Sequence, residues 1–153
     1  MESSRVKIAK QFIDHFATLD TQILKTILSE NYHHEFAPSS LNPPGPFNKQ
    51  GFFEHHAGLD TVLAGFPVTA KEYIDSESSN SVTVWATSRA VFRDDAKDAS
   101  ISDWEYEGEY IFIFTFDPTG EKIVRTIEFL DSKATADKLM VLMKRARENK
   151  NKS

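Results

Sequence analysis

The sequence contains no cysteine, fewer cations than anions and no long hydrophobic run. The absence of cysteine excludes a disulfide framework, a thiolate metal site and a cysteine nucleophile. Lys and Arg number 18 against 23 Asp and Glu, and the net charge of −5 argues against nucleic acid and anionic membrane as partners, because both need a basic footprint. No window approaches the ~20 apolar residues of a membrane helix, and the N-terminus lacks the apolar core of a signal peptide. We therefore expect a cytoplasmic protein.

Aromatic side chains are abundant. The 153 residues include 12 Phe, 4 Tyr and 2 Trp. The length matches one ordinary domain, which we place at residues 1–153. So much ring area in a chain of this size predicts either a dense core or an apolar cavity.

The order of periodic segments predicts the fold class. We expect helices over residues 4–19, after Asp20 up to the region of Tyr32, and from Asn48 to Gly65, with the proline-rich segment 38–48 as a loop. We expect strands over 68–75, 82–93, 104–116 and 121–130, and a last helix capped by Asp131 or Ser132. Helices, an antiparallel meander and a final helix indicate an α+β fold, and a sheet curved around the helices can enclose a cone-shaped cavity.

The strand 104–116 carries large side chains on both faces. Tyr110 and Phe112 share one face, whereas Glu107, Glu109 and Ile111 share the other, because strand side chains alternate. One face should meet the helices and the cavity. The other face, if the chain does not cover it itself, needs a partner chain, so we expect a homodimer.

Three stretches carry a resemblance to a known family. They are the helix from Gly51 that ends in Phe66-Pro67, the turn and strand Gly120-Glu-Lys-Ile-Val-Arg-Thr-Ile-Glu-Phe-Leu-Asp131, and the combination of His34-x-Phe-Ala-Pro-x-Ser-Leu41 with Trp104-x-Tyr-x-Gly-Glu-Tyr110. Together they resemble SnoaL-like polyketide cyclases and isomerases of the nuclear transport factor 2-like superfamily, and among them fungal isomerases or cyclases of meroterpenoid and tetrahydroxanthone biosynthesis. The resemblance covers roughly residues 4–147 and implies a cone-shaped α+β barrel.

Two histidines are candidates for acid–base chemistry, since imidazole titrates near neutrality. His55 is in register with Phe52 and Leu59 and should face inward, and His34 lies in the motif that resembles the fungal enzymes. The neighbouring His33 and His56 should be more exposed, because adjacent side chains on a helix diverge by about 100°. The same divergence argues against a metal site, and we expect none.

Several carboxylates are candidates for the second proton-transfer group. Glu128 and Asp131 are three residues apart, so at most one should point into the cone from a regular strand. Asp131 is equally well placed as the N-cap of the last helix. Glu107 and Glu109 are either cavity acids or a solvated edge.

The remaining candidates concern substrate binding. Arg89 and Arg125 alternate with apolar strand residues and either bind a substrate oxygen or form surface ion pairs. Core packing explains many of the rings, and a subset should line the cavity. The candidate lining residues are Phe52, Leu59, Trp85, Trp104, Tyr110 and Phe112. The loop over residues 38–47 is a candidate lid.

Two functions remain open from the sequence. The first is a cofactor-free isomerase or cyclase of a polycyclic polyketide or meroterpenoid, which removes a proton next to a carbonyl, stabilises the enolate and returns the proton or closes a ring. His55, His34, Glu107, Glu128 and Asp131 are its candidate catalytic residues, and dehydration is a close variant. The second is a non-catalytic module that binds a hydrophobic ligand or docks a partner. Outward-facing histidines and acids, with a cone filled by Phe and Trp, would favour the second.

Overall fold

The structure, a computed structural model, describes residues 1–152. The helical segments are α1 Ser4–His15, α2 Gln22–Ile27, η1 Ser39–Leu41, α3 Lys49–Asp60, η2 Asp94–Ala96, α4 Ser132–Ala134, the π-helical turn η3 Thr135–Leu139 and α5 Met140–Asn151. The strands are β1 Leu28–Ala37, β2 Phe47–Asn48, β3 Leu63–Gly65, β4 Val68–Ser76, β5 Ser81–Arg89, β6 Val91–Phe92, β7 Glu107–Phe116 and β8 Ile123–Leu130.

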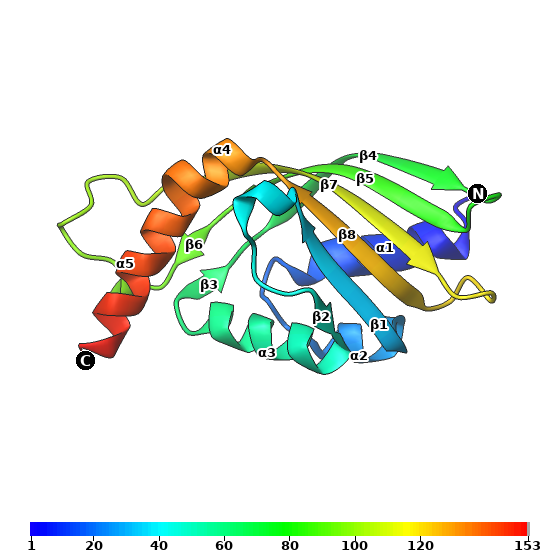
Figure 1. Cartoon of the computed structure of the whole chain (residues 1–153), viewed down its shortest axis with the longest axis horizontal. Coiled ribbons are helices and arrows are strands. Elements are labelled where there is room, and N and C mark those ends of the chain that lie inside the picture. The colour runs from blue at the N-terminus through cyan, green and yellow to red at the C-terminus, as the bar shows by residue number, and fades with distance from the viewer. Residues whose placement is uncertain (153) are drawn as a thin grey trace.

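Six of these strands form a curved sheet in the order β2-β1-β8-β7-β5-β4, and β3 pairs with β6 in a separate ribbon. Neighbouring strands of the large sheet are antiparallel except β1 and β8, which are parallel. Helices α1 and α3 lie on the concave side of the sheet, and the C-terminal helices cross one end (Figure 1). The predicted α+β class is confirmed. The sheet stays open, so the expected barrel is a curved sheet closed off by helices.

Side-chain caps explain where helices begin. The Asn48 side chain accepts a hydrogen bond from the backbone amide of Gly51, and Asp131 accepts one from Ala134. Both residues are the N-caps that the sequence predicts. The second helix begins one residue later than expected, because Thr21 occupies the N-cap position, although Asp20 still accepts a hydrogen bond from the amide of Gln22.

The alternation of β7 is confirmed and builds the core. Gly108, Tyr110, Phe112 and the following even-numbered residues are buried, whereas Glu107 and Glu109 are exposed. The buried rings pack against α1, where Phe12 lies 4.9 Å from Phe114 between ring centroids. The aromatic residues thus supply a dense core at one end of the cone, and the cavity lies at the other.

The second and third predicted helices extend too far. The second, expected up to the region of Tyr32, ends at Ile27, and residues 28–37 form β1, because Tyr32, His34 and Phe36 alternate with more exposed side chains and the strand pairs with β8. The third helix ends at Asp60 rather than at Gly65. Gly65 lies in β3 against the carbonyl oxygen of Ala17, in a space that a β-carbon would fill.

No helix among residues 1–152 is both long enough and apolar enough to cross a bilayer.

Candidate active site

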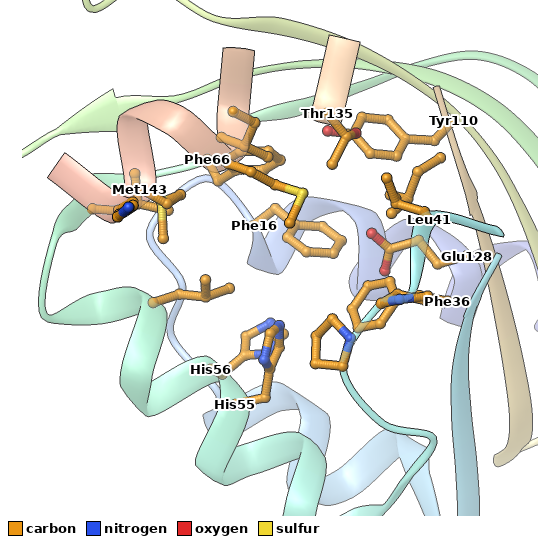
Figure 2. Close-up of a pocket in the computed structure, with 18 of the residues that line it drawn as sticks. Phe16, Phe36, Leu41, His55, His56, Phe66, Tyr110, Glu128, Thr135 and Met143 are labelled. Atoms are coloured by element: carbon orange, nitrogen blue, oxygen red, sulfur yellow. The ribbon is translucent and has the colours of Figure 1, made fainter. Parts of the chain in front are cut away.

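A cavity of about 550 Å³ lies between the sheet, α3 and the C-terminal helical segment (Figure 2). Most of its wall is aliphatic or aromatic, which suits a largely apolar ligand. The lining residues are Phe16, Leu19, Phe36, Leu41, Pro43, Pro44, His55, His56, Leu59, Leu63, Phe66, Tyr110, Glu128, Leu130, Thr135, Leu139, Met140, Val141, Met143, Lys144 and Arg147. The proline-rich loop therefore contributes to the wall, as the lid hypothesis requires.

Glu128 carries the one carboxylate among the described residues that line this cavity. Because side chains alternate along β8, Glu128 lies on the buried face with Thr126, whereas Phe129 points outward. Glu128 is 7% exposed, and its carboxylate projects into the cavity (Figure 2). An ionisable group in an apolar chamber is a candidate for chemistry.

His34 holds this carboxylate from behind. The Nε2 atom of His34 lies 3.1 Å from Oε1 of Glu128, and the hydroxyl of Tyr32 lies 2.7 Å from Nδ1 of the same ring. Burial raises the pKa of Tyr32 well above its usual value, so its hydroxyl keeps its proton and donates to Nδ1. The ring then carries its own proton on Nε2 and donates it to Glu128. The three groups form one directed chain of hydrogen bonds.

The parallel pairing of β1 with β8 brings this chain together. His34 is opposite Thr126, and Phe36 is opposite Glu128, so the imidazole and the carboxylate are diagonal neighbours on one sheet face. Phe52 of α3 stacks on the imidazole, with 4.1 Å between ring centroids. The His34 side chain is completely buried, which fixes its orientation.

His55 lines the cavity, as its register on α3 predicts. Its ring lies 5.1 Å from that of Phe47 and 5.5 Å from that of Phe36, between ring centroids. Burial, with smaller contributions from His34 and Arg147, lowers the pKa of His55 to about 4. His55 is therefore a neutral imidazole at neutral pH.

A second histidine pair lies deeper, between α1 and α3. The Nε2 atoms of His15 and His56 are 2.8 Å apart, and Nδ1 of His15 donates to the carbonyl oxygen of Phe12. Burial lowers the pKa of His15 to about 4 and that of His56 to about 2. The expectation that His56 is exposed is wrong, because α3 turns this residue towards Phe52 and the core.

Three hydroxyl groups meet in the core beside the cavity, and Tyr110 is the member of this cluster that also lines the cavity. The hydroxyls of Tyr110 and Ser88 are 2.6 Å apart, and the hydroxyl of Tyr106 lies close to the same point above Gly108. Burial raises the pKa of Tyr110 well above its usual value. Tyr110 lines the cavity and keeps its phenolic proton, and its hydroxyl is hydrogen-bonded to Ser88.

The other candidate acids lie outside this cavity. Glu107, Glu109 and Asp131 line a polar groove of about 500 Å³ at the ends of the strands, together with Arg89. The alternation of β7 turns both glutamates to the solvated face, and Asp131 is exposed and caps α4. The structure therefore corrects their placement in the cone, and of the two acids Glu128 and Asp131 only the first points inward.

Several candidate binding residues are also placed elsewhere. Arg125 and Trp85 are exposed on the outer sheet face, where the Trp85 indole donates to Glu109 at 2.6 Å. Trp104 packs on Phe92, with 5.2 Å between ring centroids.

Phe52 and Phe112 are completely buried core residues rather than lining residues. Leu59 and Tyr110 line the cavity as predicted.

The sequence analysis did not identify the contribution of the C-terminal helix. Met140 and Lys144, and likewise Met143 and Arg147, are four residues apart on α5, so these side chains share one side of the helix, and all four line the cavity. This spacing was a usable signal for a second functional face. The apolar stripe that contains Leu142 and packs into the core obscures this spacing in the sequence.

No family model matches the chain. It is 30% identical over 132 residues to the austinoid biosynthesis cluster protein H of Aspergillus calidoustus, covering 86% of this chain and 85% of that protein.

Solved structures share the fold. AusH of Aspergillus nidulans has a TM-score of 0.71 at 21% identity, with 86% of each chain covered. The BvnE pinacolase of Penicillium brevicompactum has a TM-score of 0.76 at 20% identity, with 95% of this chain and 96% of that chain covered. A putative SnoaL-like polyketide cyclase from Jannaschia superposes with a TM-score of 0.67 at 12% identity, with 88% of this chain and 90% of that chain covered.

The curated relative is matched over most of both chains. The chain belongs to the family of the fungal austinoid biosynthesis cluster protein H, and it shares its fold with SnoaL-like polyketide cyclases.

Proposed function

We propose that this protein is a cofactor-free isomerase or cyclase of fungal secondary metabolism that acts by proton transfer on a polycyclic polyketide or meroterpenoid. The observation that carries the proposal is the single cavity carboxylate, Glu128, held by His34 inside an otherwise mostly apolar chamber. The similarity to an austinoid biosynthesis cluster protein and to a pinacolase supports a biosynthetic enzyme.

The proposed reaction begins at Glu128. The ionised carboxylate takes the proton from a carbon next to a substrate carbonyl, and the electron pair of that bond moves to the carbonyl oxygen to give an enolate. The protonated Tyr110 hydroxyl is the donor that we assign to the enolate oxygen. Glu128 then returns the proton to a different carbon, or the enol carbon closes a ring. The carboxylate ends as it began, so no redox partner is required.

His34 acts as a positioning residue in this scheme. Its Nε2–H fixes Oε1 of Glu128, which leaves the second oxygen to meet the substrate. Tyr32 holds the ring in the required tautomer through Nδ1. His55 is a weak base with a pKa of about 4, and we assign it to hydrogen bonding of the substrate rather than to proton removal.

The proposed proton removal can be tested on a ketone that carries an acidic carbon, without knowing the natural substrate. We expect the protein to accelerate deuterium incorporation into 2-tetralone, a bicyclic ketone, in D₂O. Glu128→Gln should lower the protein-dependent rate about 100-fold or more, because it removes the base and keeps the shape. Proton NMR measures the exchange.

The matched control is Glu109→Gln, which removes an exposed carboxylate on the opposite sheet face and should leave the rate unchanged. Equal rates for Glu128→Gln and the unmodified protein would remove Glu128 from the mechanism. Binding of 2-tetralone without any exchange above the buffer rate would favour the alternative, a non-catalytic module for hydrophobic ligands, which the largely apolar wall would also suit.

We also propose that the protein forms a homodimer through the outer face of its sheet. Trp85, Ile111 and Phe129 are direct neighbours on β5, β7 and β8, and each is more than a third exposed. Three large apolar side chains at the centre of a sheet favour a second sheet packed on them.

A further inference from the structure

Helix α5 has two sides with different charge environments. On one side Arg145 binds Asp98, and Lys150 lies 2.7 Å from a carboxylate oxygen of Asp95. These pairs attach α5 to the segment around η2. The cations on this side are therefore neutralised by the chain itself.

Lys144 and Arg147 lie on the other side and line the cavity. Neither has a carboxylate within 4.0 Å among residues 1–152, although the chain carries an excess of anions. They are three residues apart on a helix, so their side chains are neighbours. The positive charge of Arg147 is also felt at His55 across the cavity, where it helps to keep that imidazole neutral.

The charges of the cavity wall are therefore separated along its length. Figure 2 places Met143, which directly precedes Lys144, on the opposite side of the cavity from Glu128. The wall between them is lined largely by aromatic and aliphatic groups such as Phe16 and Phe66. A ligand that complements this wall has an apolar body, a proton-transfer site at one end and an anionic group at the other.

We propose that Lys144 and Arg147 form an anion subsite, which binds a carboxylate on the polycyclic substrate and so sets which end of it faces Glu128. This inference rests on the proposed function and names the class of its substrate. A guanidinium and an ammonium on adjacent turns can each donate to one carboxylate.

Two fluorescent probes with the same ring system test the subsite. 8-Anilinonaphthalene-1-sulfonate carries an anion, and N-phenyl-1-naphthylamine is its uncharged counterpart. The double variant Lys144→Gln/Arg147→Gln should raise the dissociation constant of the sulfonate about tenfold. It should change the dissociation constant of the amine less than about twofold. The effect should shrink as salt is added, because salt screens charges near a surface.

Two variants control the experiment. Lys133→Gln removes an exposed cation that is paired with Asp137 outside the cavity, and it should change neither affinity. Leu59→Trp fills the cavity and should weaken both probes, which locates them there. Thermal unfolding of each variant confirms that the fold is kept.

An unchanged sulfonate affinity in the double variant, or an equal loss for both probes, would overturn the anion subsite. The result is separable from the proton-transfer proposal. A protein that shows this charge preference but does not exchange a proton of 2-tetralone would support the anion subsite and contradict the proton-transfer enzyme. Proton exchange without the charge preference would support the enzyme and contradict the anion subsite.

Discussion

At the scale of single residues, the state of each polar group follows from its burial and its neighbours. Tyr32 keeps its proton because it is buried, so it can donate to Nδ1 of His34 and leave Nε2 as the donor of the ring. The donor then fixes one oxygen of Glu128. A single buried phenol thereby sets the direction of the whole chain of hydrogen bonds.

Gly108 has a comparable role at the hydroxyl cluster. A β-carbon there would lie 2.5 Å from the hydroxyl oxygen of Tyr110 and 2.7 Å from that of Tyr106. We expect Gly108→Ala to lower the free energy of unfolding by about 1–3 kcal/mol, since overpacking must displace the buried tyrosines. Urea denaturation measures the change.

Gly58→Ala provides the matched control for this prediction. Gly58 lies within α3 with no atom near its missing β-carbon, so the alanine should be neutral or stabilising by up to about 1 kcal/mol. A similar loss for both variants would show that close approach at Gly108 is not the cause.

At the scale of elements, the histidine pair His15–His56 joins α1 to α3 inside an apolar layer. Each ring packs on phenylalanine, with His15 at 4.2 Å from Phe16 and His56 at 4.4 Å from Phe52, between ring centroids. A neutral pair satisfies its shared hydrogen bond without a buried charge. The contact is therefore sensitive to protonation.

This pair predicts a pH dependence of stability. The pKa values of His15 and His56 in the folded protein, about 4 and about 2, lie below the usual 6.5. Between these values the two histidines bind protons in the unfolded chain but not in the folded chain. The free energy of unfolding should fall as pH drops from about 6.5 to about 4, by about 1 kcal/mol per pH unit for each histidine. Urea denaturation at several pH values measures this slope.

The double variant His15→Leu/His56→Leu should reduce the slope in that range by about 2 kcal/mol per pH unit, and the remaining slope belongs to His55, whose pKa is also lowered to about 4. His33→Gln, which removes a half-exposed histidine paired with Glu35, should leave it unchanged. A double variant with the original slope would assign the pH dependence to other groups.

At the scale of the whole molecule, the sheet separates two surfaces. Helices cover its concave face (Figure 1), where the cavity lies. Its outer face exposes Trp85, Ile111 and Phe129 and has a polar margin. The margin includes Glu109, which accepts a hydrogen bond from the Trp85 indole. A partner copy on this face would leave the cavity on its far side.

The dimer proposal predicts the effect of one charge at the centre of this face. We expect the protein to sediment at about twice its 17.4 kDa chain mass and Ile111→Glu to sediment as a monomer, because the central strand would bury an unpaired carboxylate. Analytical ultracentrifugation measures both.

Val91→Glu adds a charge at an exposed apolar residue of β6, outside the large sheet, and should leave the mass unchanged. A monomeric unmodified protein at micromolar concentration would contradict the dimer.

The sequence predicts most local structure because its signals are local. The alternation of β7 and the caps Asn48 and Asp131 are confirmed. The strand β1 was missed because its inward residues include His34, which hides the apolar period of Tyr32 and Phe36.

The composition and periodicity of the chain thus determined an acidic α+β protein with many aromatic core residues, and the absence of cysteine excluded thiol chemistry. Tertiary structure alone decided which groups meet. His34 and Glu128 are 94 residues apart, and their contact depends on the parallel register of β1 and β8, which no local pattern encodes. The same holds for Lys144 and Arg147, whose position at the cavity depends on how α5 crosses the end of the sheet.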